Sequence, residues 1–153
     1  MAEKRKIMAV ASVGGHFVQL LTITKALEKY YEIIYCSTND NCRDLIGGRE
    51  YHLMEDFSRK NPWKLMTGFV KQIRMIKETR PIAVISTGAA PGLAALMAAK
   101  VCGVKTIWID SIANVQHLSA SGRLARKFVS RIYTQWPALA DEKVIYVGNV
   151  LNQ

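Results

Sequence analysis

The chain has 153 residues, half of them hydrophobic, so its composition excludes a disordered protein and predicts a folded core. Its formal net charge of +9 predicts an anionic partner such as a phosphorylated substrate, an acidic membrane surface or nucleic acid. No apolar stretch reaches the roughly 18 residues that a membrane-crossing helix needs, so no membrane span is expected.

Seven apolar runs along the chain predict β-strands, and four longer runs between them predict helices. The strands are expected at residues 7–13, 32–37, 51–54, 82–86, 104–109, 132–135 and 144–147. The helices are expected at residues 17–29, 63–79, 93–102 and 123–131. Apolar residues in the strands do not alternate with polar ones, which indicates burial on both faces, as in a parallel sheet. The sequence therefore predicts a doubly wound, mostly parallel α/β domain spanning residues 1–153.

Two glycines and a histidine stand where the first predicted strand gives way to the first predicted helix. Gly14 and Gly15 permit a tight turn that brings backbone N–H groups close to a ligand. The start of the following helix favours an anion such as a phosphate or pyrophosphate. His16 adds an imidazole, a group that exchanges a proton near neutral pH. The alternative is that these residues form only a turn and a local helix start.

Unusual residues also follow the fourth and fifth predicted strands. Thr87, Gly88 and Gly92 come after the fourth strand, where the glycines permit close approach of the backbone to a ligand. Asp110 follows the fifth strand. Ligands of such sheets bind outside the carboxyl ends of the strands, so we expect these segments to line one crevice. The alternative for Asp110 is a helix cap or a loop acceptor.

The loops do not match the known nucleotide-binding signatures. Residues 12–17 read SVGGHF, which is not the G-x-G-x-x-G pattern, and no acidic residue ends the second predicted strand. The chain also lacks a P-loop, a D-x-D pair and a cluster of metal ligands, so no metal and no cofactor are expected. No nucleic-acid reader motif accompanies the positive charge, so nucleic acid is not expected as a partner.

The predicted helix at residues 63–79 is both basic and amphipathic. Seven basic residues and one acidic residue lie between Arg59 and Arg80. Such a helix, with an aromatic residue near its start, is typical of binding to a membrane surface. The alternative is an ordinary surface helix with its apolar side on the sheet. The residues expected to meet an anionic membrane are Trp63, Lys64, Phe69, Lys71 and Arg74.

Motifs spread over nearly the whole chain resemble the membrane-recruiting subunit of two-chain glycosyltransferases. That family includes the Alg-fourteen-type subunit of the dolichol-linked N-acetylglucosaminyltransferase and the bacterial exopolysaccharide and capsule subunits called glycosyltransferase enhancers. The resemblance rests on SVGGH at 12–16, STGAAPG at 86–92, WIDS at 108–111, LSASGRL at 118–124, YTQWP at 133–137 and YVG at 146–148. Family members often have glutamate where this chain has Asp110.

The resemblance implies a GT-B glycosyltransferase split over two chains, with this chain as the Rossmann-like N-terminal half that binds the acceptor. The partner subunit would bind the UDP-sugar, and the acceptor would be a sugar on a polyprenyl pyrophosphate in polysaccharide biosynthesis. Transfer would invert the anomeric centre and would need no metal. The chain would lie in the cytoplasm, peripheral on the inner face of the cell membrane.

Within that family His16 is expected to act as the general base, because inverting transfer needs a group that takes the proton of the acceptor hydroxyl. Asp110 would orient His16 or serve as the base itself. The residues expected to hold the acceptor and its pyrophosphate are Gly14, Gly15, Thr87, Gly88 and Gly92. A second function class stays open: a stand-alone Rossmann-like protein that binds a nucleotide or a phosphate.

Overall fold

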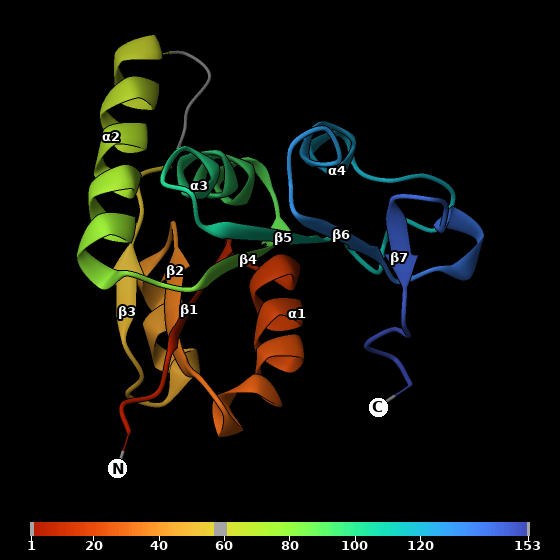
Figure 1. Cartoon of the computed structure of the whole chain (residues 1–153), viewed down its shortest axis with the longest axis horizontal. Coiled ribbons are helices and arrows are strands. Elements are labelled where there is room, and N and C mark those ends of the chain that lie inside the picture. Colours follow the sequence, from red (N-terminus) through yellow and green to blue (C-terminus); the bar gives the residue numbers. More distant parts are fainter. Residues whose placement is uncertain (1, 57–60, 153) are drawn as a thin grey trace.

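The chain folds around one parallel β-sheet, seen here in a computed structural model that describes residues 2–56 and 61–152. The described strands follow the order β3-β2-β1-β4-β5-β6-β7, and every neighbouring pair is parallel (Figure 1). The strands are β1 Lys6–Ala11, β2 Glu32–Ser37, β3 Tyr51–Leu53, β4 Ala83–Gly88, β5 Lys105–Ile109, β6 Arg131–Thr134 and β7 Val144–Tyr146. The predicted fold class and all seven predicted strands are confirmed.

Helices cover both faces of the sheet, as the doubly wound prediction requires. In Figure 1, α1 lies on one face and α2, α3 and α4 lie on the other. The α-helices are α1 Gly15–Thr24, α2 Pro62–Thr79, α3 Ala90–Val101 and α4 Ala120–Ala125. Three 3₁₀ segments complete the described elements: η1 Leu27–Lys29, η2 Asp40–Ile46 and η3 Pro137–Leu139. The first predicted helix is thus shorter than expected, since α1 ends at Thr24.

The last predicted helix, at residues 123–131, is wrong in both its bounds. The helix begins earlier because the Ser119 hydroxyl caps it by accepting a hydrogen bond from the Gly122 N–H at 2.9 Å. It ends at Ala125 because the chain beyond it joins the sheet. The Ser130 N–H donates to the Thr106 carbonyl at 3.0 Å, and the Thr106 N–H donates to the Ser130 hydroxyl at 3.1 Å.

The core lies on both sides of the central strands. All six residues of β4 are buried, which explains why its sequence shows no alternation. Leu96 of α3 and Trp108 of β5 are buried on one face, and Phe17 of α1 and Tyr35 of β2 on the other. The strand order reverses between β1 and β4, so the carboxyl ends of these two strands form the switch point of the sheet.

Candidate functional site

Two helices begin side by side at the switch point of the sheet. α1 follows β1 through Gly14, whose φ of 89° suits a glycine, and α3 follows β4 through Ala89. Neither helix has a side chain that caps its first N–H groups. The partial positive charges of both helix starts therefore remain available at one edge of the sheet, which favours an anionic ligand.

Gly14 and Gly15 leave room for such a ligand. Both glycines are exposed, and a Cβ atom built on either would meet no heavy atom within 4 Å. This open space is compatible with binding a phosphate or pyrophosphate, and that role remains a prediction.

The imidazole of His16 is held by the loop that follows β4. Its Nδ1 lies 3.0 Å from the Thr87 carbonyl oxygen, and the Thr87 hydroxyl donates to the His16 carbonyl at 2.6 Å. A carbonyl oxygen only accepts hydrogen bonds, so Nδ1 must carry the proton in this arrangement. In the neutral ring, Nε2 then carries the lone pair and is the nitrogen that can accept a proton.

The segment at the end of β4 and the start of α3 packs against the His16 ring and does not line an open cleft. It contains Thr87, Gly88 and Gly92, which we expected to hold the acceptor. All three are buried, and both backbone groups of Gly88 are occupied: its N–H donates to Ser86 and its carbonyl accepts from Ser12. A Cβ atom at Gly88 would lie 2.8 Å from the Nδ1 of the His16 ring. A Cβ atom at Gly92 would overlap the Ser86 hydroxyl, so α3 can approach β4 closely only because this residue is glycine.

Asp110 does not orient His16, which corrects one of our expectations. Its carboxylate is 1% exposed and accepts four hydrogen bonds from its own side of the sheet. Oδ1 accepts from Trp108 Nε1 at 2.9 Å and from the Ser119 hydroxyl at 2.6 Å. Oδ2 accepts from the Ser119 N–H at 2.9 Å and from Asn114 Nδ2 at 3.2 Å. The partner of His16 Nδ1 is Thr87, and Asp110 instead fastens the loop between β5 and α4.

This loop is also tied to the helix that carries His16. The Ile112 N–H donates to Gln19 Oε1 at 3.0 Å, and the Ile112 carbonyl accepts from Trp136 Nε1 at 2.7 Å. Gln19 lies three residues after His16 on α1 and is buried. Sequence reasoning missed Gln19, although a buried glutamine among the apolar residues of a helix indicates a specific hydrogen-bond partner.

The predicted membrane residues on α2 fall into three groups: exposed, packed against the core, and ion-paired. Trp63 is 74% exposed and Lys64 is exposed, whereas Phe69 packs against the core and is no longer a candidate for membrane contact. Lys71 pairs with Glu55, and Arg74 pairs with Glu78. Sequence reasoning missed that Met66 and Val70 stay exposed beside Trp63. Arg59 and Lys60, which belong to the predicted basic run, lie outside the described residues.

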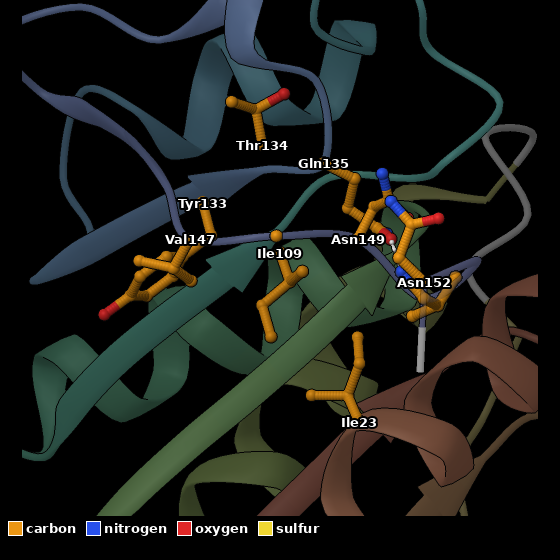
Figure 2. A pocket seen from close by; sticks show the side chains of 10 residues that line it. Ile23, Ile109, Tyr133, Thr134, Gln135, Val147, Asn149 and Asn152 are labelled. Carbon is orange, nitrogen blue, oxygen red and sulfur yellow. Dashed lines mark hydrogen bonds between the residues drawn. The ribbon is translucent and has the colours of Figure 1, made fainter.

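A cavity of about 560 Å³ lies on the α1 face, between α1 and the C-terminal segment (Figure 2). Ile23 of α1 points toward Ile109 at the end of β5, and Asn149 and Asn152 border the cavity beside them. Local sequence patterns do not predict this cavity, because its walls come from four separate elements.

The described residues contain neither a membrane-crossing helix nor a metal-binding cluster. Across residues 2–56 and 61–152, no helix has both the length and the apolar character to cross a membrane. In the same ranges, no three His, Cys, Asp or Glu side chains lie close enough together to hold a metal ion.

The parallel sheet, with its switch point between β1 and β4, defines a Rossmann-like α/β fold that matches the N-terminal halves of GT-B proteins. It superposes on MurG of Acinetobacter baumannii with a TM-score of 0.80 at 14% identity, over 95% of this chain and 46% of that one. A UDP-N-acetylglucosamine 2-epimerase from Rickettsia bellii gives a TM-score of 0.72 at 14% identity, over 97% of this chain and 46% of that one. These structures share the architecture.

Residues 62–150 match the family described as oligosaccharide biosynthesis protein Alg14 like, and the chain therefore belongs to that family. It is 21% identical to the UDP-N-acetylglucosamine transferase subunit ALG14 of Mus musculus, over 97% of this chain and 84% of that one. These findings confirm the Alg-fourteen-type part of the resemblance. The exopolysaccharide and capsule assignment stays a prediction.

A second relative is a single, longer chain. The UDP-N-acetylglucosamine--N-acetylmuramyl-(pentapeptide) pyrophosphoryl-undecaprenol N-acetylglucosamine transferase of Oceanobacillus iheyensis is 29% identical over 97% of this chain. The match covers 46% of that relative, so the present chain spans about half of its length.

Proposed function

We propose that the chain is the acceptor-binding subunit of a two-chain glycosyltransferase that transfers a sugar from a UDP-sugar to a saccharide on a polyprenyl pyrophosphate. The observation that carries the proposal is His16, whose Nε2 lone pair stands beside two uncapped helix starts. Membership of the Alg14-like family supports the same function, and the names of its relatives make UDP-N-acetylglucosamine the first donor to test. The saccharide would serve polysaccharide biosynthesis, such as that of an exopolysaccharide or capsule.

In the proposed reaction, His16 acts as the general base. The acceptor hydroxyl oxygen forms a bond to the anomeric carbon of the donor while the bond from that carbon to the UDP oxygen breaks. The hydroxyl proton passes to His16 Nε2, and UDP leaves with the bonding electron pair. Gly14, Gly15 and the starts of α1 and α3 hold the acceptor pyrophosphate by backbone N–H groups and helix dipoles. Thr87 keeps the ring in the tautomer that accepts the proton.

The first test is dependence on a partner subunit. The chain purified alone is expected to show no transfer from UDP-N-acetylglucosamine to a polyprenyl-pyrophosphate-linked sugar, because the proposed donor-binding half lies on another polypeptide. Co-expression with the UDP-sugar-binding subunit of the same organism is expected to restore transfer, measured as radiolabelled lipid product. Full turnover by the chain alone would contradict the proposal. Tight binding of a nucleotide by the isolated chain, with no transfer in any pairing, would favour a stand-alone binding protein.

We also propose that the first turns of α2 bind the inner face of the cell membrane from the cytoplasm. Trp63, Met66 and Val70 are spaced at three and four residues, share one side of the helix, and are 74%, 60% and 58% exposed. Lys64 is exposed beside them, and the chain as a whole is strongly basic. An apolar stripe on a basic protein surface suits binding to the interface of an anionic membrane.

Vesicle sedimentation tests this surface. Trp63→Ala is expected to weaken binding to vesicles containing anionic lipid by roughly tenfold, because burial of a large side chain contributes about 1.5–3 kcal/mol. Binding is also expected to fall with added salt, since each basic residue near the surface contributes about 1 kcal/mol. Tyr30→Ala is the matched control, because Tyr30 is 65% exposed but lies just before the start of β2, whereas Trp63 lies beyond the carboxyl end of β3. Equal binding of both variants, or equal binding to neutral vesicles, would show that α2 only covers the sheet.

A further inference from the structure

A cavity of about 440 Å³ lies at the amino ends of β6 and β7, where the chain that follows α4 enters the sheet. The candidate site at His16 follows the carboxyl end of β1, so the two lie at opposite edges of the parallel sheet. Five of the six charged side chains that line the cavity are cations. The lining cations are Lys100, Arg126, Lys127, Arg131 and Lys143, and the lining carboxylate is Glu142.

A long stretch of the chain beside this cavity carries basic residues and no acidic ones. No aspartate or glutamate lies between Asp110 and Asp141. This stretch includes α4 and the start of β6, and its basic residues are Arg123, Arg126, Lys127 and Arg131. Three of these four cations line the cavity, so the positive charge there begins as a property of the local sequence.

Two further cations reach the cavity from other elements. Lys100 comes from the last turn of α3, and its Nζ donates to the Phe128 carbonyl at 2.9 Å. Lys143 immediately precedes β7, and the register of β6 and β7 places it beside Arg131 at the amino edge of the sheet. Cations from three separate parts of the chain thus meet at one cavity.

The ion pairs of the structure do not neutralise this cavity. Arg126 pairs with Asp141 at 2.6 Å. Within the described ranges 2–56 and 61–152, no carboxylate forms an ion pair with the other four lining cations. Asp141 and Glu142 offset two of the five positive charges, so three remain in excess. Like charges gathered at one cavity repel one another, and an anion placed between them removes that repulsion.

We propose that this cavity binds a soluble diphosphate group. Two linked phosphates carry about three negative charges at neutral pH, which matches the excess positive charge of the cavity. Ammonium and guanidinium groups form charge-assisted hydrogen bonds to phosphate oxygens. Lys127, Arg131 and Lys143 are exposed and supply these donors. This second anion site is independent of the role of His16.

The size of the cavity leaves room for more than the phosphates. Sites for small ligands occupy about 300–1,000 Å³, so about 440 Å³ suits a diphosphate together with a group esterified to it. Phe128 and Ile145 are half-buried in the lining and offer apolar contact to such a group. Two sources supply this chemistry: inorganic pyrophosphate and a nucleoside diphosphate.

The position of the cavity favours a soluble ligand over a lipid headgroup. α2 spans 18 residues, or about 27 Å, and ends just before β4, so its first turns lie far from the amino ends of the strands. Figure 1 shows α2 beside β3, at the opposite end of the sheet from β6 and β7. The cavity therefore lies away from the membrane surface proposed for the start of α2.

Backbone amide resonances of the ¹⁵N-labelled full chain provide a direct test, with pyrophosphate, UDP and orthophosphate titrated in turn. We expect saturable shifts at residues 127–131 and at Lys143 with both diphosphates, and at least about tenfold weaker binding of orthophosphate, which forms fewer charge-assisted hydrogen bonds. Tighter binding of UDP would identify a nucleotide as the source, and equal binding would identify the diphosphate group alone. Shifts at Gly14 and Gly15 report on the candidate acceptor site separately, so failure at one site is distinguishable from failure at the other.

A double variant removes two of the exposed cations while keeping long polar side chains. Lys127→Gln combined with Arg131→Gln is expected to weaken the binding that Lys143 reports by at least about tenfold, with the response of Gly14 and Gly15 to pyrophosphate unchanged. Tm should change by less than about 4 °C, because substitutions of exposed side chains have small effects on stability.

The control removes the same net charge at a distance. Lys25→Gln combined with Lys29→Gln changes two exposed lysines at the end of α1 and in η1, and should leave affinity at the cavity within about twofold. Equal losses in both double variants would show that only the overall charge matters and would overturn the proposal. So would equal affinity for orthophosphate and pyrophosphate, or no shift at the cavity with either diphosphate. In that last case, weaker sedimentation of the cavity variant with phosphatidylglycerol vesicles would assign these cations to a membrane surface.

Discussion

His16→Ala is expected to lower kcat of the two-subunit enzyme by about 10²–10⁴-fold, the usual contribution of a general base. The structure gives the physical reason, since the Thr87 carbonyl fixes the proton on Nδ1 and leaves Nε2 to accept one. The loss should fall on kcat more than on KM, because proton transfer occurs in the transition state. Steady-state kinetics with saturating UDP-sugar and lipid-linked acceptor measures both constants.

A matched histidine and a binding measurement complete this test. His52→Ala removes an imidazole on β3 that pairs with Glu50, away from the site, and should leave kcat within about twofold, like other surface changes. Co-purification should show that His16→Ala still assembles with the partner subunit. A variant that assembles normally and keeps near-full kcat would move the base to another residue or to the partner.

Asp110→Ala is expected to lower the free energy of unfolding by about 3 kcal/mol or more. It leaves the donors of Trp108, Ser119 and Asn114 without their acceptor, and each buried donor that loses its partner costs about 1–3 kcal/mol. Asp110→Asn keeps one acceptor oxygen but turns an NH₂ group toward these donors, so we expect an intermediate loss. Urea unfolding followed by circular dichroism measures the midpoint and the slope.

An exposed carboxylate on the same chain provides the control. Asp40 pairs with Arg43 at the surface, so Asp40→Ala should change the free energy of unfolding by less than about 1 kcal/mol. The kcat of folded Asp110→Asn should fall less than that of His16→Ala, because Asp110 does not contact the imidazole. If Asp110→Ala unfolds at the same urea concentration as the unchanged chain, the carboxylate does not hold the loop together.

The arrangement of the strands, and the sheet edge at which the candidate site residues lie, could be predicted from the sequence because both depend on local patterns. Apolar runs without alternation mark strands buried on both faces, and β4 is the clearest case. The glycines and His16 fall at a strand end by their position along the chain, and parallel topology places such ends together. No tertiary contact has to be known for either inference.

The partners of the site residues could not be predicted, because they depend on contacts between distant segments. His16 and Thr87 are 71 residues apart, and nothing local to either residue favours their pairing over one between His16 and Asp110. The predicted C-terminal bound of α4 failed for the same reason, since Ser130 leaves the helical pattern to pair with Thr106, 24 residues earlier. Likewise the apolar residues of α2 divide into packed and exposed ones only once the sheet is present, as Phe69 and Trp63 illustrate.

The reciprocal hydrogen bonds between His16 and Thr87 have a consequence for motion. They join the loop after β1 to the loop after β4 in both directions, so either loop can move only if both bonds break together. We therefore expect the hydrogen-bonded amides of Ser12 and Gly88 at this junction to exchange only through large-scale opening, whereas the uncapped N–H groups in the first turn of α1 exchange rapidly. Any closure that shields the reacting atoms from water must then come from elements that move over this rigid edge, and not from the edge itself.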